Sequence, residues 1–309
     1  MSFSIPVNYG ENPGQLHAIL CQVATLPART MEEVNHNTDL ILEWMDRAAS
    51  GYPGIDMLIF PECCFQGMHY TEYPKVALSW DSEPIRRVCE KCKELQVWGV
   101  FNPWIKPDDG RFIENTAILV NDEGEIVAKY VKMNPWVPYE PTVPGRGVNV
   151  VDGPKGAKIA LMICADGKYQ EIWRECRLQG ANLVVHVSHW PAPYEYGHKL
   201  SNLAGAFFNR IPVLAVNSVG MDEGYVFCGG SLVVDQTGGV LKEAPLGIEW
   251  MLESAINPTA MCAAPDNGIT SNLLWEFDHR GACCPDQDGI GLDASDYTAY
   301  MARLNKKEN

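Results

Sequence analysis

The sequence predicts a layered α/β fold with a mixed β-sheet. Along the 309 residues, short apolar runs of strand length alternate with longer amphipathic stretches of helical period. Two further pairs of apolar runs flank turn-forming residues at 121–124 and 235–239, which is typical of hairpins. Strands separated by helices favour parallel pairing, whereas hairpins pair antiparallel, so the combination indicates a mixed sheet covered by helices.

The first half of the chain carries clear boundary signals for its elements. Thr30 is suited to cap the first helix, because Glu33 follows it at the spacing of a capping box. Pro61 ends the second strand, and Pro84 suits the first turn of the second helix. The expected elements are strand 15–23, helix 31–49, strand 57–60, helix 82–95 and strands 97–101, 115–120 and 125–132.

The second half repeats this style and then loses its periodicity beyond Ile256. Its expected elements are strand 157–163, helix 170–179, strand 183–187, helix 199–209 and strands 213–217, 231–234 and 240–243. Residues 258–292 are expected to be mostly loop, with a terminal helix at 297–304. We therefore expect one domain over 1–309, with its core at about 15–256 and a C-terminal extension at 257–309.

Composition excludes several classes of partner. The formal net charge of -15 argues against nucleic acid and anionic membranes, because both require clustered Lys and Arg. No apolar run approaches the ~18 residues that a membrane span needs, and residues 1–14 lack the pattern of a signal peptide. Eleven cysteines is an odd number, and Cys21 and Cys164 stand in or beside apolar runs. Reduced thiols in the cytoplasm are the expected state.

Three reactive side chains each follow an apolar, strand-like run. Glu62 follows 57–60, Lys132 follows 126–131 and Cys164 follows 159–163. Ligands bind in α/β sheets at the carboxyl ends of the strands, so these three side chains are expected to converge if their strands are neighbours. Taken singly, each residue is more often structural: a buried thiol, a loop carboxylate or a solvated lysine.

Together the three residue types suit acyl transfer by a thiol. A free thiol has a pKa of about 8.5, so a nearby carboxylate can remove its proton as general base. Attack on a carbonyl places negative charge on the substrate oxygen, which a lysine ammonium and the backbone N–H after the nucleophile can stabilise. The expected roles are base for Glu62, nucleophile for Cys164 and charge stabiliser for Lys132, with the N–H of Ala165 as a further donor.

The sequence segments around these residues resemble the signature motifs of the nitrilase superfamily of carbon–nitrogen hydrolases. The matching segments are Phe60-Pro61-Glu62, Tyr130-Val131-Lys132, Met162-Ile163-Cys164-Ala165-Asp166-Gly167, Glu171-Ile172-Trp173-Arg174, Gln179-Gly180-Ala181, 215–220 and 227–231. The resemblance extends from about Gln15 to Glu243, in order. It implies a four-layer α-β-β-α sandwich with two mixed sheets, a Glu-Lys-Cys triad, no metal or organic cofactor, and homo-oligomers built on dimers, possibly hexamers.

Within the superfamily the likeness is greatest to the aliphatic amidase and formamidase branch. The loop 135–141 resembles the substrate-lining loop of that branch, and its Glu140 matches a second glutamate that positions the substrate and the lysine. Cys164-Ala165-Asp166-Gly167 also resembles the amidase version, whereas true nitrilases usually have Trp-Glu after the cysteine. The implied activity is cleavage of a small aliphatic or formyl amide to acid and ammonia through a thioester.

The substrate pocket departs from the branch at one turn. Trp136, Tyr139, His189 and Trp190 are the expected lining residues, although a tryptophan in a Pro-rich loop more often serves packing. Ser188-His189-Trp190 stands where the branch has a turn ending in tyrosine, which removes a hydroxyl and adds bulk. Hydrolysis or hydration of a nitrile, cleavage of an N-carbamoyl compound, and a catalytically silent binding protein are the alternatives.

Overall fold

Two mixed β-sheets form the centre of the structure, a computed structural model that describes residues 14–68, 72–108, 112–137, 139–222 and 224–262. The first sheet has the order β15 (Trp250–Ile256), β1 (Leu16–Gln22), β2 (Met57–Ile59), β3 (Trp98–Phe101), β5 (Glu114–Val120) and β4 (Trp104–Ile105), and β6 (Ile126–Val131) pairs with β5. The second has the order β14 (Val240–Glu243), β13 (Leu232–Val234), β10 (Val213–Asn217), β9 (Leu183–Ser188), β8 (Lys158–Ile163) and β7 (Val150–Asp152). A small separate ribbon pairs β11 (Val219–Asp222) with β12 (Tyr225–Cys228).

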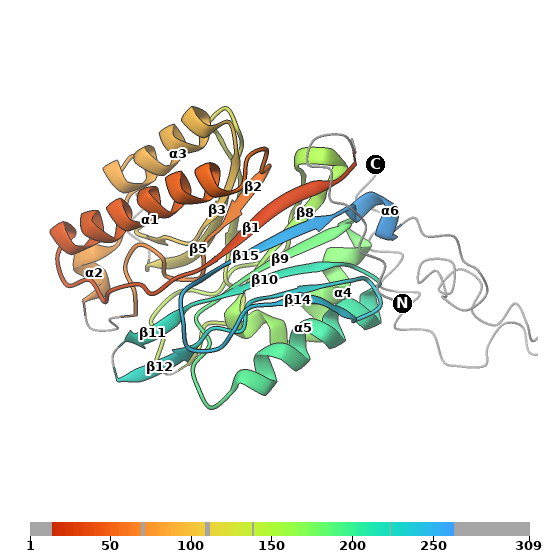
Figure 1. Ribbon diagram of the computed structural model, residues 1–309. Helices are drawn as coiled ribbons and strands as arrows, with labels where there is room; N and C mark the ends of the chain where they lie inside the picture. Colours follow the sequence, from red (N-terminus) through yellow and green to blue (C-terminus); the bar gives the residue numbers. More distant parts are fainter. Residues whose placement is uncertain (1–13, 69–71, 109–111, 138, 223, 263–309) are drawn as a thin grey trace, which may run out of the picture. The chain divides into compact units, whose positions relative to one another are not determined.

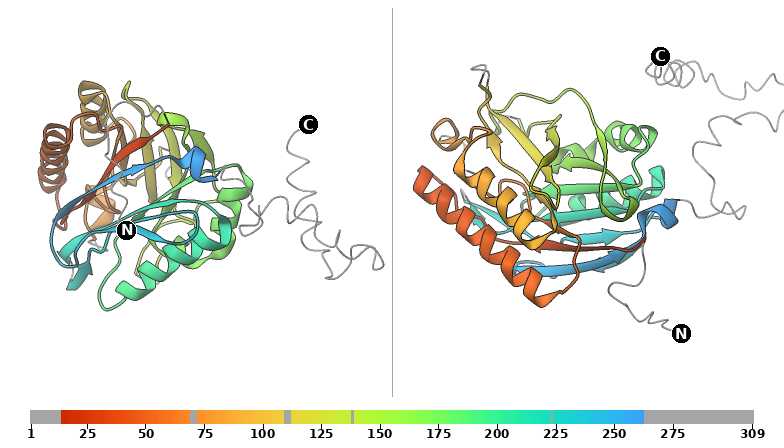
Figure 2. Two further views of the ribbon diagram at one scale, coloured as in Figure 1. Left: turned by 45° about the vertical axis from the view of Figure 1, so that its right-hand side comes forward. Right: turned by 90° about the horizontal axis from the view of Figure 1, so that it is seen from above.

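Helices cover the outer face of each sheet. The first sheet carries α1 (Met31–Gly51) and α3 (Glu83–Leu95), which run side by side, with the short α2 (Tyr73–Val76) at their end (Figures 1 and 2). The second carries α4 (Gln170–Leu178) and α5 (Glu195–Asn209) on its far side (Figure 1). The order of layers is therefore helix, sheet, sheet, helix, which confirms the predicted α-β-β-α sandwich.

Alternation along β1 explains how the layers are held together. Leu16, Ala18 and Leu20 belong to the apolar core between the two sheets, whereas Ile19 and Cys21 belong to the core beneath α1 and α3. Successive strand residues point to opposite faces, and both faces of this sheet are covered, so every residue of the strand is buried.

The predicted boundary signals are confirmed at the first helix and at both hairpins. The Thr30 hydroxyl accepts the Glu33 N–H at 3.3 Å, and the Glu33 carboxylate accepts the Thr30 N–H at 3.0 Å. This reciprocal capping box satisfies two backbone donors that the helix cannot pair internally. Antiparallel pairing of β5 with β6 and of β13 with β14 corresponds to the two predicted hairpins.

The structure differs from the sequence-based elements at several places, and the short elements α2, β4, β7, β11 and β12 were not predicted. Strand β15 was not predicted, because Ser254 occupies a buried position and weakens the apolar alternation. Helix α5 begins at Glu195 instead of Lys199, because Gly197, although a poor helix former, is accommodated in its first turn close to the Trp190 ring. A short helix, α6 (Pro258–Cys262), lies where loop was expected, and the Asn257 side chain accepts the Ala260 N–H there.

Every described residue belongs to one unit of the chain, Met1–Ala264. The predicted terminal helix at 297–304 and most of the predicted loop 258–292 lie outside the described residues. Within those residues, none of the helices has the length and apolar character that crossing a bilayer requires.

Candidate active site

The three candidate catalytic residues follow three strands that belong to two different sheets. Glu62 stands three residues beyond the end of β2, Lys132 directly after β6, and Cys164 directly after β8. Strands β2 and β6 lie in the first sheet and β8 in the second. The side chains therefore meet between the sheets instead of along the edge of one sheet, which the sequence alone did not indicate.

Lys132 is held by two carboxylates. Its Nζ donates to Glu62 Oε1 at 2.8 Å and to Glu140 Oε2 at 2.6 Å. All three side chains are almost completely buried. A buried charge is tolerated only when it is paired and hydrogen-bonded. The Lys132 ammonium is paired and hydrogen-bonded with both carboxylates.

A tight turn after β6 brings Glu140 back to Lys132. The backbone N–H groups of Tyr139 and Glu140 both donate to the Trp136 carbonyl at 2.9 Å. The Trp136 N–H in turn donates to Glu140 Oε2 at 2.9 Å, and the Thr142 hydroxyl donates to Oε1 at 3.1 Å. The carboxylate is thus fixed by its own loop as well as by the lysine.

Two buried asparagines that the sequence interpretation did not single out complete the carboxylate cluster. Asn115 Nδ2 lies 2.8 Å from both Glu62 Oε1 and Glu140 Oε1 and donates to each. Asn102 orients it by donating to Asn115 Oδ1 at 2.9 Å, and Asn102 Oδ1 accepts the Cys63 N–H at 2.7 Å. The polar pair Asn115-Thr116 at the start of the otherwise apolar strand 115–120 was the signal that could have identified Asn115.

Cys164 occupies a sharp turn between β8 and a following 3-10 helix, Cys164–Lys168. Its φ of 45° lies in the left-handed region, which is rare for a residue other than glycine and is found preferentially at functional sites. The His186 ring lies 3.0 Å from the Cys164 carbonyl oxygen and 2.8 Å from Asn202 Oδ1. The backbone of Cys164, the candidate nucleophile, is thereby anchored to the second sheet.

Asp166, also within the Cys164 motif, ties this turn to the first sheet. Its carboxylate accepts the Tyr130 hydroxyl at 2.7 Å and the Asn134 N–H at 2.8 Å. Burial raises the pKa of Asp166 above its usual range, and the nearby Lys132 charge opposes that rise. The contact joins the Lys132 strand to the Cys164 turn, so the two motifs are positioned together.

The electrostatics of the site keep the thiol neutral and the carboxylate ionised. Burial, reinforced by the Glu62 carboxylate, raises the pKa of the Cys164 thiol far above its usual range, although Lys132 opposes the shift. Burial alone would raise the pKa of Glu62, but Lys132 outweighs it and the net pKa is lowered. Burial would lower the pKa of Lys132, but Glu140 and Glu62 hold it well above its usual range. A neutral thiol beside an ionised carboxylate and an ammonium is the arrangement that general-base activation requires.

These groups line one small cavity. Glu62, Lys132, Glu140, Cys164, Trp136 and His189 all contribute to it, together with Cys63, Met68 and Trp104. The free volume is about 10 Å³, close to the space that one water molecule needs. Any substrate that fits with little rearrangement must therefore be very small.

The remaining predicted site residues lie around this cavity and do not line it. Tyr139 packs on Trp136, with ring centroids 4.9 Å apart, and Tyr225 joins them at 5.7 Å from Trp136. Ala165 contributes the backbone that follows the nucleophile. Trp190 is buried against His198 of α5, with ring centroids 5.6 Å apart, which accounts for its bulk by packing.

His189 connects the base to a further buried carboxylate. Its backbone N–H donates to Glu62 Oε2 at 2.9 Å, and its ring Nδ1 lies 2.5 Å from the Ser218 hydroxyl. Its Nε2 lies 3.4 Å from Asp222 Oδ2, which also accepts the Met68 N–H. Asp222 and Ser218 were not identified from the sequence, because nothing in the strand pattern relates β11 to this end of the sandwich.

Comparison with known proteins supports this assignment of family. Residues 19–264 match the carbon–nitrogen hydrolase family. A formamidase of Pseudomonas syringae pv. syringae (strain B728a) is 31% identical over 264 residues, which cover 85% of this chain and 78% of that protein. A formamidase of Bacillus cereus (strain B4264) is 33% identical over 252 residues, which cover 81% of this chain and 76% of the relative.

Solved structures share the fold. The amidase from Nesterenkonia sp. AN1 superposes with a TM-score of 0.70 at 24% identity, covering 82% of this chain and 95% of that one. XC1258 from Xanthomonas campestris, a CN-hydrolase superfamily protein, gives a TM-score of 0.72 at 22% identity, covering 81% and 93%. With the family matched over most of its length and the fold reproduced, this chain belongs to the carbon–nitrogen hydrolase family, as its motifs predicted.

Proposed function

We propose that the protein is an amidase that hydrolyses a small aliphatic or formyl amide to the acid and ammonia, with formamide as the best substrate. The observation that carries this proposal is the cavity of about 10 Å³ in which Cys164, Glu62, Lys132 and Glu140 meet. A formyl amide has no side chain on its carbonyl carbon, so it demands the least expansion of this space. The formamidases related to this chain support the same substrate class.

The chemistry follows from the positions of the groups. Glu62 takes the proton from Cys164 as Sγ attacks the carbonyl carbon, and the carbonyl oxygen becomes an oxyanion. The Lys132 ammonium and the Ala165 N–H stabilise that charge. Glu62 then gives its proton to the leaving nitrogen, the C–N bond breaks, and ammonia leaves a thioester on Cys164.

Hydrolysis of the thioester repeats the steps with water. Glu62 removes a proton from water as its oxygen attacks the thioester carbonyl, and the oxyanion forms at the same donors. The C–S bond breaks and the proton returns to Sγ, which releases the acid. Glu140 and Asn115 hold Lys132 and Glu62 throughout and exchange no protons. A solved variant of the Nesterenkonia amidase, 25% identical to this chain, shows acrylamide added to its active-site cysteine, which supports a nucleophilic role for Cys164.

Ammonia release from a substrate panel tests the proposal. Formamide, acetamide, acetonitrile and N-carbamoylglycine would be compared at matched concentrations, with the Cys164→Ala variant as blank. We expect the highest kcat/KM for formamide and a lower value for acetamide. Turnover of acetonitrile or N-carbamoylglycine alone would assign a different reaction to the same residues, and no turnover of any compound would indicate a silent binding protein.

We further propose that the protein works in the cytoplasm as a homo-oligomer, with residues 1–309 forming one hydrolase domain that ends in an extension. The cysteines that the structure describes are free thiols, as expected in a reducing compartment. Along α5, the large apolar side chains of Tyr196, Phe207 and Phe208 are exposed, and a second copy of the chain would cover them. Light scattering after size exclusion measures the mass directly; a monomer at micromolar concentration would contradict the oligomer.

A further inference from the structure

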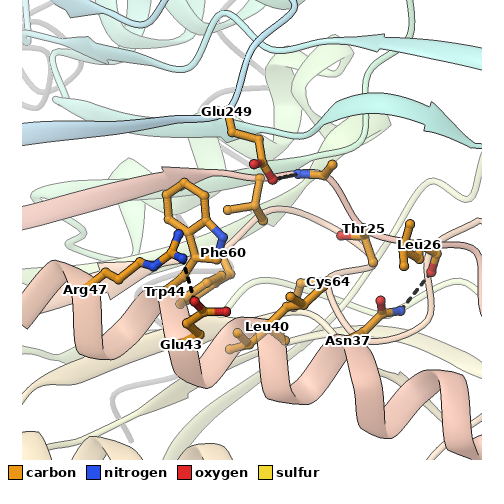
Figure 3. Close-up of a pocket in the computed structure, with 13 residues that line it drawn as sticks. Thr25, Leu26, Asn37, Leu40, Glu43, Trp44, Arg47, Phe60, Cys64 and Glu249 are labelled. Carbon is orange, nitrogen blue, oxygen red and sulfur yellow. Dashed lines mark hydrogen bonds and ion pairs between the residues drawn. The ribbon is translucent and has the colours of Figure 1, made fainter.

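A second and larger cavity lies on the other side of the segment that carries Glu62. It has a volume of about 330 Å³, within the range of sites that bind small molecules. It opens where one face of α1 meets the chain just after β1 and Glu249, which directly precedes β15 (Figure 3). Asn37, Leu40, Ile41, Trp44 and Arg47 line it from α1 at helical spacing.

The cavity contains a buried hydrogen-bond acceptor without a partner. Asn37 is 2% exposed, and its Nδ2 donates to the carbonyl oxygens of Leu26 and Phe65, both at 2.8 Å. Its Oδ1 has no hydrogen-bond partner among the residues that the structure describes. In Figure 3 Asn37 is drawn among the residues that line the cavity, with its amide nitrogen turned toward the Leu26 carbonyl. A buried acceptor left unpaired is destabilising, so the site calls for a ligand that donates a hydrogen bond.

Charge and shape define the ligand further. The charged residues that line the cavity are two carboxylates, Glu43 and Glu249, and one guanidinium, Arg47, which is paired with Glu43 at 2.5 Å. Among the residues that the structure describes, Glu249 accepts one hydrogen bond, from the Ala24 N–H at 3.1 Å. The cavity is therefore formally negative, as is the whole chain at -15, and the half-buried Trp44 ring offers a face for a cation.

The same short segment forms part of both cavities. Phe60 and Cys64 line the larger one, whereas Glu62 and Cys63 line the catalytic one. The Cys64 sulfur accepts the Asn102 N–H at 3.3 Å, and the Asn102 side chain holds Asn115, which holds Glu62. A ligand that contacts Phe60 or Cys64 can therefore shift the hydrogen bonds that position Glu62, the catalytic base.

We propose that this cavity is an effector site for a small amphipathic organic cation, a protonated amine with an apolar body, and that its occupancy alters the surroundings of Cys164 through the segment 60–64. The ammonium donates to Asn37 Oδ1 and Glu249, and the apolar body packs on Trp44 and Phe60. Such a cation is too large for the catalytic cavity as the structure has it.

Calorimetric titration of the whole protein with 2-phenylethylammonium tests binding. The neutral 2-phenylethanol and the anionic 3-phenylpropanoate have nearly the same shape and serve as ligand controls. We expect saturable binding of the cation only, weakened about three- to tenfold by Trp44→Leu and by Glu249→Gln. Trp80→Leu and Glu123→Gln, which change an indole and a carboxylate outside the cavity, should bind as the wild type does. Equal binding of the anion, or unchanged affinity in both cavity variants, would overturn the site.

The rate at which iodoacetamide alkylates Cys164, followed by mass spectrometry of its peptide, tests the coupling. We expect 2-phenylethylammonium to change this rate at least about twofold in the wild type, with a half-maximal concentration that is about three- to tenfold higher in Trp44→Leu, which separates an effect through the cavity from one at the catalytic site. The same rate with and without the cation in the wild type would overturn the effector role. The readout does not depend on turnover of formamide, so its failure is distinguishable from a failure of the proposed amidase activity.

Discussion

Glu140 lies closer to Lys132 than the expected base does: its Oε2 is 2.6 Å from Lys132 Nζ, compared with 2.8 Å for Glu62 Oε1. One ammonium therefore serves two carboxylates, and with a neutral Cys164 thiol the cluster carries one net negative charge. Burial, reinforced by the Glu62 carboxylate, raises the pKa of Cys164, whereas Glu140 and Glu62 raise the pKa of Lys132 against the effect of burial. Glu140 holds the lysine, and Glu62 is left able to accept a proton.

Removing the nucleophile should abolish turnover without unfolding the protein. Cys164→Ala deletes one half-buried sulfur, and we expect ammonia release to fall by at least about 10³-fold while the thermal midpoint changes little. Cys89→Ala, at a half-buried thiol on α3, is the matched control and should retain wild-type kinetics. Residual turnover above that limit in Cys164→Ala would refute the assigned role.

Neutralising Glu140 should lower kcat with the fold intact. Glu140→Gln leaves Lys132 with a single charged partner and disturbs its position, so we expect a loss on the order of 10²-fold in kcat. Steady-state kinetics and circular dichroism measure the two effects separately. Glu114→Gln, at the start of β5 and outside the cavity, controls for the loss of a carboxylate. If Glu140→Gln had wild-type kinetics, the loop 135–141 would contribute packing and not catalysis.

The pH profile of kcat/KM should be flat across the neutral range. Because the pKa of Glu62 is lowered, the base stays ionised as the pH falls and is lost only below its usual value of 4.5. Because the pKa of Lys132 is raised, the ammonium persists above 10.5. Activity measured between about pH 5 and about pH 9 should therefore show no inflection. A rise with an apparent pKa between 7 and 9 would instead indicate a thiolate formed before substrate binds.

The buried hydrogen bond between Tyr130 and Asp166 should contribute to stability. Tyr130→Phe leaves one oxygen of a fully buried carboxyl without its 2.7 Å donor, and we expect a loss of about 1–3 kcal/mol in the free energy of unfolding. Chemical denaturation measures the change. Tyr194→Phe, at an exposed tyrosine, should leave stability unaltered. Equal stability of both variants would show that the Asp166 carboxyl is satisfied without Tyr130.

Asp222 should influence catalysis through His189. Asp222→Asn removes the charge beside His189 Nε2, and the backbone of His189 holds Glu62, so we expect kcat to fall about tenfold with little change in KM. The acidic limb of the pH profile should also move, which a merely structural residue would not cause. The exposed Asp152, changed to Asn, provides the control. If neither the acidic limb of the pH profile nor kcat changed in Asp222→Asn, Asp222 would have no role in positioning Glu62.

The sequence by itself determined the fold class, the family and the three candidate catalytic residues. Strand and helix periods, and the capping box at Thr30 and Glu33, indicate the elements of the α/β fold. The family and the roles of the candidate residues, including Glu140 beside Lys132, were expected from the resemblance of the motifs to the nitrilase superfamily and its amidase branch.

Only the tertiary structure decided which distant groups share a cavity. Glu62 and Cys164 come from opposite sheets, and the partners Asn102, Asn115 and Asp222 stand on strands or loops with no local sign of their contacts. The larger cavity beneath Trp44 has the same origin, since it exists only where α1 meets the chain after β1 and Glu249. Sequence periodicity reports which face of an element is buried, whereas the identity of the opposing side chain depends on how the layers pack.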